Sequence, residues 1–354
     1  MTGETVLSIA CDESGSEGEN LMLSQHAVFV HASVSVAMDA ATEFMDMVRS
    51  SMRAQSPEVK SKTALASRNR PALLAAMGSS DLTGNINLVE KSYFVVARLL
   101  EITVAQKASS EGQDIAGSGG GRELADFFHA KGPSAVGRQV WDGLLRSFND
   151  LVRIYAREGT QSPTAKPFFD ALVLARFSCT NRQVGNILDE IWAARYFAAE
   201  YEDASPFGLR EMDPMAFTLS SVARNWGMRL GDVPFELVTD QYSGLTDELR
   251  AQIVEAVRAP LSIGPVALPE PNLRGIRMVD SRGDSRVQIA DILGGIGREI
   301  VRLAVDGVFD DELQVMVHEM LDYNVMCSTG SAIDVLLDRR PLRYFASWQS
   351  AQSL

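Results

Sequence analysis

The sequence predicts an α/β protein in which a mixed sheet flanked by helices is interrupted by a mostly helical insertion. Apolar runs typical of buried strands occur near both ends of the 354-residue chain. Between them, residues 136–230 carry apolar residues at helical spacing with no strand pattern. A glycine-rich stretch before this helical region marks a boundary. One sheet-forming core with an insertion accounts for all three observations.

Residues 1–106 form the first part of the expected core. Residues 5–11 are apolar and residues 14–20 favour a turn, which predicts a strand followed by a loop. Residues 25–36 are rich in β-branched and aromatic residues, so they are expected to be the second strand of a hairpin. Further along, helices are expected at residues 37–53, 71–77 and 91–106, with another strand at residues 84–89.

Residues 107–231 are expected to be a glycine-rich linker followed by a helical insertion. Residues 107–135 contain a glycine run around residues 117–121 and the pair Gly132-Pro133, a composition typical of flexible connections. A phosphate-cradling loop is the alternative for residues 117–122, but the Gly-Lys-Ser/Thr ending of such loops is absent. Helices are predicted at residues 136–156, 167–177, 183–201 and 214–230.

Residues 232–305 form the second part of the expected core. Strands are predicted at residues 234–240 and 274–279, and helices at residues 245–257 and 285–303. In the last of these helices, small Gly294 and Gly295 would allow a close approach to the sheet. Residues 306–354 are expected to be a C-terminal helical appendage with a polar tail.

Composition and charge restrict the classes of function. An apolar fraction of 46% and a charged fraction of 22% are ordinary for a globular protein. The formal net charge of −13 argues against a protein that coats long duplexes non-specifically. Basic residues nevertheless cluster at residues 60–70 and around Asp280. They either bind phosphate or neutralise the acidic surface of the protein itself.

Cysteine usage and hydropathy bear on the compartment. The three cysteines, Cys11, Cys179 and Cys327, are scattered, which argues against a disulfide framework and a structural zinc site. No apolar stretch reaches the roughly 18 to 20 residues of a membrane span, and the first residues lack the basic region of a secretory signal. We therefore expect a cytoplasmic protein that does not bind a membrane.

Two acidic motifs lie near opposite ends of the chain. Asp12-Glu13-Ser14-Gly15 follows the first strand, and Asp280-Ser281 and Gln288-Ile289-Ala290-Asp291 lie around the start of the last core helix. A strand end and the inner face of a helix can meet in space, and hard divalent cations prefer such oxygen ligands. The motifs predict a phosphoryl-transfer site for Mg²⁺ or Mn²⁺. The alternative is that they are turn, capping and surface residues.

These motifs, together with Glu58-x-Lys60 and an Asp ending a late strand, resemble the bacterial family known as "domain of unknown function 3800". That family is grouped with ribonuclease H-like folds. The resemblance covers roughly residues 4–106 and 232–304, where four short motifs occur in the family's order. It implies a ribonuclease H-like mixed sheet and a metal-dependent phosphodiester hydrolase, in which two metal ions are held about 3.5 to 4 Å apart.

The resemblance also implies roles for individual residues. Asp12 is the first-strand metal ligand and Asp291 the ligand on the helix, while Lys60 joins them as a catalytic residue. Asp240 is the middle ligand, with Asp280 and Glu58 as competing candidates. The candidate substrate-binding residues are polar or basic neighbours of these carboxylates: Ser14, Ser281, Arg282, Arg286 and Gln288.

Three functional classes fit the sequence. The first is a nuclease or related phosphodiesterase acting on nucleic acid or nucleotides. Because members of the family often occur in mobile or defence-related bacterial loci, foreign nucleic acid is a candidate substrate. The second is a non-catalytic ribonuclease H-like binding or scaffold module, in keeping with the acidic net charge. The third is an interaction component whose helical insertion contacts a protein partner or a second copy of the chain.

Overall fold

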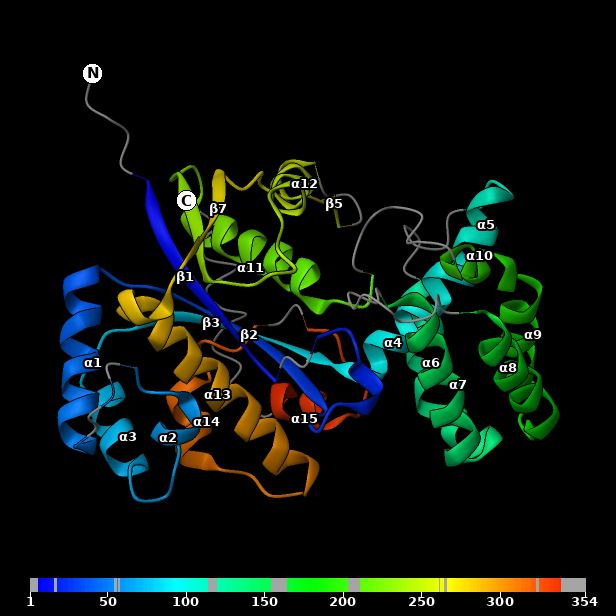
Figure 1. The fold of residues 1–354 in the computed structure, drawn as a ribbon, viewed down its shortest axis with the longest axis horizontal. Coiled ribbons are helices and arrows are strands. Elements are labelled where there is room, and N and C mark those ends of the chain that lie inside the picture. The colour runs from blue at the N-terminus through cyan, green and yellow to red at the C-terminus, as the bar shows by residue number, and fades with distance from the viewer. Residues whose placement is uncertain are drawn as a thin grey trace.

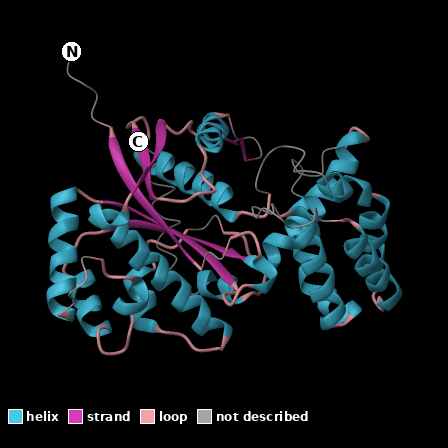
Figure 2. Cartoon of the chain, viewed as in Figure 1, coloured by secondary structure: helices cyan, strands magenta, loops and turns pink. Residues whose placement is uncertain are grey.

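A five-stranded mixed sheet flanked by helices forms the centre of the molecule (Figures 1 and 2). The computed structural model describes residues 6–15, 18–53, 56, 58–113, 120–153, 164–202, 211–260, 262–263, 266–322 and 325–338. The expected mixed α/β fold class is confirmed over these residues. No helix among them is both long and apolar enough to cross a lipid bilayer.

The sheet has the strand order β3-β2-β1-β4-β7. Its members are β1 (Leu7–Ser14), β2 (Val28–Ser35), β3 (Thr83–Glu90), β4 (Phe235–Asp240) and β7 (Leu273–Val279). Strands β1, β2 and β3 pair antiparallel, whereas β4 runs parallel to both β1 and β7. Two segments nearly 230 residues apart in the sequence are therefore neighbours at the centre of the sheet.

Strand β1 is longer than the sequence predicts. Its apolar run ends at Cys11, but Asp12, Glu13 and Ser14 continue the antiparallel pairing with β2, opposite Ala32, His31 and Val30. Pairing with a long partner strand keeps these polar residues extended, although their types favour a turn. The acidic motif therefore begins inside the sheet, and the chain leaves it at Gly15, where φ is 80°.

One face of the sheet is covered by α13 (Ser285–Val305), which lies diagonally across it (Figure 1). Its apolar residues, such as Ile292 and Ile296, pack with Ala10 and Val238 from the strands in one cluster. The helices α1 (Met38–Met52), α2 (Ser61–Ala64), α3 (Arg70–Gly78) and α14 (Asp311–Val317) surround α13 on this side. We call the face of the sheet that α13 covers the α13 face.

The opposite face is covered by α11 (Pro214–Leu230) and α12 (Asp247–Arg258). Because successive side chains of a strand point to opposite faces, Ile9 and Cys11 pack here with Leu237 and Trp226. A short hairpin of β5 (Ser262–Ile263) and β6 (Val266–Ala267) follows α12 in the sequence. We call the face of the sheet that α11 and α12 cover the α11 face.

The helical insertion packs around its own apolar core beside the sheet (Figure 1, right). Helix α4 (Lys91–Leu100), which the sequence assigns to the first part of the core, packs in this cluster as well. It passes through a π-helical turn, η2 (Glu101–Ala105), into α5 (Gln106–Ser110). The remaining helices are α6 (Gly120–Val136), α7 (Arg138–Val152), α8 (Lys166–Ser178), α9 (Arg182–Ala193) and α10 (Arg195–Ala199).

Helix α6 occupies much of the stretch for which the sequence predicts a flexible linker. An ideal Cβ on Gly132 would lie only 2.0 Å from the ring of Trp141, so this glycine serves close packing between α6 and α7. The following Pro133 is accommodated within α6, three residues before its end. Residues 117–119 of the glycine run lie outside the described residues, whereas residues 120 and 121 are in α6.

The chain after α13 returns to the sheet. Two isolated parallel bridges join Ile86 with Leu321 and Val89 with Met326, so this segment runs beside the outer strand β3. Buried Asp322 accepts hydrogen bonds from Asn85 at 3.1 Å and from Asn225 at 3.3 Å. After this segment comes α15 (Ala332–Asp338), which packs against α13. Short 3₁₀ turns lie at η1 (Leu21–Leu23), η3 (Glu200–Glu202) and η4 (Ser281–Gly283).

Candidate carboxylate site

Parallel pairing of β1 with β4 brings Asp12 and Asp240 side by side. The last paired residues are Cys11 and Thr239, and each Asp directly follows them. Ala10 and Val238 pack on the α13 face. Because residues two apart in a strand point to the same face, Asp12 and Asp240 also point to the α13 face. Two acidic side chains that are far apart in the sequence thus lie at the same level of neighbouring parallel strands, beneath α13.

Asp291 on α13 faces these two strands. Gly294 and Gly295, one turn further on, permit a close approach: an ideal Cβ on Gly294 would lie 3.3 Å from Ser14 Cβ, and one on Gly295 would lie 2.3 Å from Ser61 Cβ. The carboxylate of Asp291 accepts hydrogen bonds from Ser61 N at 2.8 Å and Ser61 Oγ at 3.1 Å. The start of α2 therefore fixes the orientation of Asp291.

The three carboxylates interact electrostatically. Burial raises the pKa of Asp12 well above its ordinary value, and the charges of Glu13, Asp291 and Asp240 raise it further, against the hydrogen bond from Glu13 N. Burial also raises the pKa of Asp291, although hydrogen bonds from Ser61 and the charge of Lys60 oppose the rise. Negative charges held close together in a poorly solvated place repel one another, which raises the free energy of the ionised form. A bound cation would offset this repulsion.

Ser281 links Asp240 to Glu58. Its backbone N donates to Asp240 Oδ1 at 3.1 Å and its Oγ lies 2.9 Å from Asp240 Oδ2 and 3.4 Å from Glu58 Oε1. Gln288 holds Ser281 in turn, because its Nε2 donates to Ser281 O at 2.9 Å while its Oε1 accepts from Arg49. Ser281 and Gln288, which are candidate substrate-binding residues in the sequence, act here as supports for Asp240.

Lys60 lies at the edge of the acidic cluster and pairs with Glu58. Burial opposes its charge, but the hydrogen bond and charge of Glu58, with the charges of Asp291 and Asp12, raise the pKa of Lys60 overall. The ammonium group is therefore charged at neutral pH and within electrostatic reach of two of the carboxylates. The Glu58-x-Lys60 motif belongs to the same site as Asp12 and Asp291.

Asp280, Arg282 and Arg286 are placed differently. Asp280 forms the N-cap of η4, and its half-exposed carboxylate pairs with Arg282 at 2.8 Å, which lowers the pKa of Asp280. Arg286 pairs with Asp284 at 2.6 Å, away from the acidic cluster. Arg282 is exposed, and its charge interacts with Glu58 and Asp240, so it stands at the rim of the site.

Ser14 is buried beside α13. An ideal Cβ on Gly294 would lie 3.3 Å from Ser14 Cβ and 3.8 Å from Ser14 N. Ser14 therefore lies in the contact between β1 and α13. The described geometry gives Ser14 a packing role at the floor of the site. Any contact of its hydroxyl with a substrate stays a prediction.

Glu13 is a partly buried acidic residue to which the motif assigns no separate role. It follows Asp12 in the strand and so points to the α11 face. The charge of Asp213, and that of Asp240 at the end of the neighbouring strand, act on it. Burial is the largest cause that raises the pKa of Glu13 to about 6. Asp213 caps α11 by accepting from Met215 N at 3.0 Å, and it accepts from Tyr242 Oη at 2.6 Å. In the sequence, the Asp213-Pro214 pair is typical of a helix start. It does not indicate that the charge of Asp213 acts on Glu13.

The donor set at the site consists of carboxylate oxygens, which suit Mg²⁺ or Mn²⁺ better than a soft metal. Among the described residues, no group of three or more His, Cys, Asp or Glu side chains is already arranged to hold a metal ion. The carboxylates of Asp12, Asp240 and Asp291 are near neighbours that interact, and hydrogen bonds from Ser61 and Ser281 orient two of them.

The site combines side chains from parts of the chain that are far apart in sequence. Asp12, Asp240 and Asp291 come from β1, β4 and α13, and Glu58 and Lys60 lie beside them. No protein-family model, curated protein or solved structure matches the chain.

Proposed function

We propose that the chain is a divalent-metal-dependent phosphodiester hydrolase of the ribonuclease H-like type, related to the family that its motifs resemble. The observation that carries this proposal is that Asp12 and Asp240 follow the last paired residues of neighbouring parallel strands beneath α13, where the charge of Asp291 also acts on Asp12. A buried carboxylate whose pKa is raised by other carboxylates is typical of functional sites.

The topology supports the same proposal. The resemblance implies one Asp on the first strand, further carboxylates from later elements and a last one on a late helix. Asp12 lies on β1, Asp240 at the end of β4 and Asp291 on α13. Three antiparallel strands followed by two parallel ones, with α13 across one face, are in keeping with a ribonuclease H-like sheet.

Asp12, Asp240 and Asp291 are the residues that would hold Mg²⁺ or Mn²⁺, with Glu58 as a further oxygen donor. A divalent ion in such a place supplies activation of water and stabilisation of the leaving oxygen. Ser61 and Ser281 would keep two of the carboxylates in position, since each donates two hydrogen bonds to its Asp. Lys60, held by Glu58, would contribute a positive charge toward the scissile phosphate.

The substrate class proposed is nucleic acid or a nucleotide, bound over the rim that Arg282 and Lys60 form. Both cations are exposed and interact with carboxylates of the site. The formal net charge of −13 makes a short or single-stranded substrate more suitable than a long duplex, because a duplex would meet the acidic remainder of the surface.

The test is a cleavage assay on single- and double-stranded DNA and RNA with Mg²⁺ or Mn²⁺. Asp12→Asn and Asp291→Asn should each lower the cleavage rate by about a thousandfold or more, because each removes a metal-binding charge. Asp280→Asn is the matched control, since Asp280 is paired with Arg282 outside the cluster and should retain most of the activity. Full activity of the Asp12→Asn, Asp291→Asn double variant would refute the proposal.

A non-catalytic binding or scaffold module is the second candidate. It is favoured by the observation that no metal-binding group is preassembled among the described residues. Isothermal titration of the wild-type chain with Mn²⁺ separates the two. Metal binding that Asp12→Asn abolishes supports the hydrolase, whereas absence of both metal binding and cleavage supports the scaffold.

A further inference from the structure

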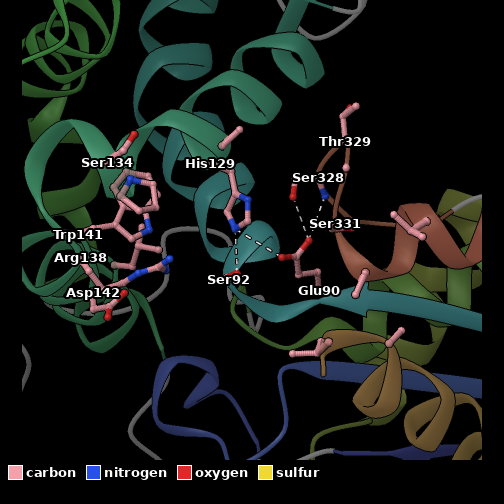
Figure 3. Close-up of a pocket in the computed structure, with 18 of the residues that line it drawn as sticks. Glu90, Ser92, His129, Ser134, Arg138, Trp141, Asp142, Ser328, Thr329 and Ser331 are labelled. Atoms are coloured by element: carbon pink, nitrogen blue, oxygen red, sulfur yellow. Dashed lines mark hydrogen bonds and ion pairs between the residues drawn. The ribbon is translucent and has the colours of Figure 1, made fainter. Parts of the chain in front are cut away.

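A cavity lies away from the carboxylate site, between the sheet, the helical insertion and the C-terminal segment (Figure 3). Its volume is about 890 Å³, within the range of small-molecule pockets. Its walls come from the end of β3 and the start of α4, from α6 and α7, from the end of α13 and from residues 328–335. Four parts of the chain that are distant in sequence thus enclose one space.

The wall formed by the sheet and α6 is polar and already ordered. Ser92 Oγ lies 2.9 Å from His129 Nε2, and Glu90 Oε1 lies 3.7 Å from the same nitrogen (Figure 3). The other oxygen of Glu90 accepts from Ser328 N at 3.1 Å. Because Ser92 and Glu90 share one ring nitrogen, they do not form a Ser-His-acid relay, in which the acid holds the opposite nitrogen.

His129 keeps one polar atom for a ligand. Its Nδ1 has no hydrogen-bond partner among the described residues, while Nε2 is occupied by Ser92. Burial lowers the pKa of His129, although Glu90 and Asp126 oppose this, so the ring is uncharged at neutral pH. An uncharged ring that is held on one side offers a fixed hydrogen-bonding atom on the other.

The facing wall, formed by α7, carries two charged side chains, Arg138 and Asp142. Arg138 makes no ion pair or hydrogen bond with any residue that the structure describes, and the same holds for Asp142 one turn further along. In Figure 3 the side chain of Arg138 extends from α7 toward the side where Ser92 and Glu90 lie.

We propose that this cavity binds a phosphate monoester with a hydroxylated body, such as a nucleoside or sugar monophosphate. The guanidinium of Arg138, on the first turn of α7, is the group suited to a phosphate, which it can bind through two hydrogen bonds. Asp142 supplies an acceptor for hydroxyl groups, and His129 Nδ1 supplies a further hydrogen-bonding atom. Apolar side chains, including Leu145, Val305 and Phe309, cover the less polar part of the ligand.

The site is separate from the proposed hydrolytic centre. The lining residue Ala304 is thirteen positions after Asp291 on α13, which corresponds to about 20 Å along the helix axis. The proposal therefore stands or falls independently of phosphodiester cleavage. Asp12→Asn, which removes a carboxylate of the other site, should leave binding in this cavity unchanged.

Isothermal titration of the full chain with AMP, ribose 5-phosphate, adenosine and inorganic phosphate tests the proposal. At least one of the two monoesters should bind with a dissociation constant of roughly 10 to 100 μM, and adenosine and inorganic phosphate should each bind at least about tenfold more weakly. Binding of AMP alone identifies a nucleotide site, and binding of both identifies recognition of the sugar phosphate. No heat with either monoester, or equal affinity for adenosine, would overturn the proposal.

Variants assign the binding to this cavity. Arg138→Gln should weaken monoester binding by at least about tenfold, because it removes the charge that pairs with the phosphate. Arg146→Gln is the matched control, since Arg146 is exposed two turns further along α7 and does not line the cavity. Unchanged affinity in Arg138→Gln, or an equal loss in Arg146→Gln, would contradict the assignment.

Discussion

Glu13 shows how one residue in a strand can report on the pH dependence of stability. Its pKa is raised from 4.5 to about 6, mainly by burial, so the folded chain holds this proton more tightly than the unfolded chain does. A raised folded-state pKa contributes stability that is complete below about pH 4.5 and is lost as the pH rises through about 6. The loss corresponds to about 2 kcal/mol.

We therefore expect Glu13→Gln to increase the free energy of unfolding by about 2 kcal/mol near pH 7.5 and to change it little near pH 4. The physical reason is that glutamine resembles the protonated carboxyl and needs no charge in the buried site. Urea unfolding of both proteins at the two pH values measures this. An equal gain at both pH values would show that packing, and not ionisation, is responsible.

Asp12 leads to a related expectation for metal binding. Its pKa is raised by burial and by neighbouring carboxylates, so a proton competes with a cation for this oxygen. Mn²⁺ should therefore raise the melting temperature more at about pH 8 than at about pH 5.5. Thermal unfolding with and without Mn²⁺ tests this, with Asp12→Asn as the control that should lose the difference. A stabilisation that does not depend on pH would place the ion elsewhere.

At the scale of the element, α13 depends on glycines where it crosses the sheet. An ideal Cβ on Gly297 would lie 2.8 Å from Ile86 Cγ2 and 3.0 Å from Val30 Cγ1, and one on Gly295 would meet Ser61. Added methyl groups at such contacts force the helix away from its partners. The positions of Asp291 and of the helix axis are therefore set by the same small residues.

Gly295→Ala should lower metal-dependent cleavage, because its methyl group would displace Ser61 from the carboxylate of Asp291. We expect it also to destabilise the fold by about 1 to 3 kcal/mol. Gly143→Ala in α7 is the matched control: nothing lies within 4 Å of its ideal Cβ, so alanine should stabilise the helix by up to about 1 kcal/mol. Thermal unfolding and the cleavage assay together check both variants.

The elements also show what the sequence could and could not reveal. Periodicity was sufficient for β4, α11 and α13, where apolar spacing is regular over the whole element. Composition, from which a flexible linker was predicted, was misleading for α6, because a glycine needed for contact with Trp141 cannot be told in the sequence from a glycine in a linker. The approach of Asp12 to Asp240 follows from parallel pairing, whereas the outward turn of Asp280 depends on its pairing with Arg282.

At the scale of the whole molecule, Asp322 ties the C-terminal segment to the rest of the fold. It is 3% exposed and accepts hydrogen bonds from Asn85 on β3 and Asn225 on α11. The contact joins three parts of the chain that are far apart in sequence. The sequence does not indicate that Asp322 is buried and hydrogen-bonded, because its partners come close only in the tertiary fold.

Asp322→Ala should reduce the free energy of unfolding by about 2 to 4 kcal/mol, because it leaves buried amide groups without their acceptor. The exposed Asp311→Ala, at the start of α14, should cost about 1 kcal/mol or less and serves as the control. Chemical unfolding followed by fluorescence compares them. A loss below about 1 kcal/mol for Asp322→Ala would mean that water replaces the carboxylate.

The bridges from Leu321 and Met326 to β3 have a further consequence for the behaviour of the protein in solution. A bare outermost strand offers free amide and carbonyl groups to other molecules, and so promotes aggregation. The returning segment covers the edge of the sheet at β3. At the other edge, the exposed charged side chains of Arg274 and Arg277 on β7 oppose pairing with another chain. Shortening the chain before residue 320 would thus be expected to yield a protein that precipitates, even with Asp12, Asp240 and Asp291 intact.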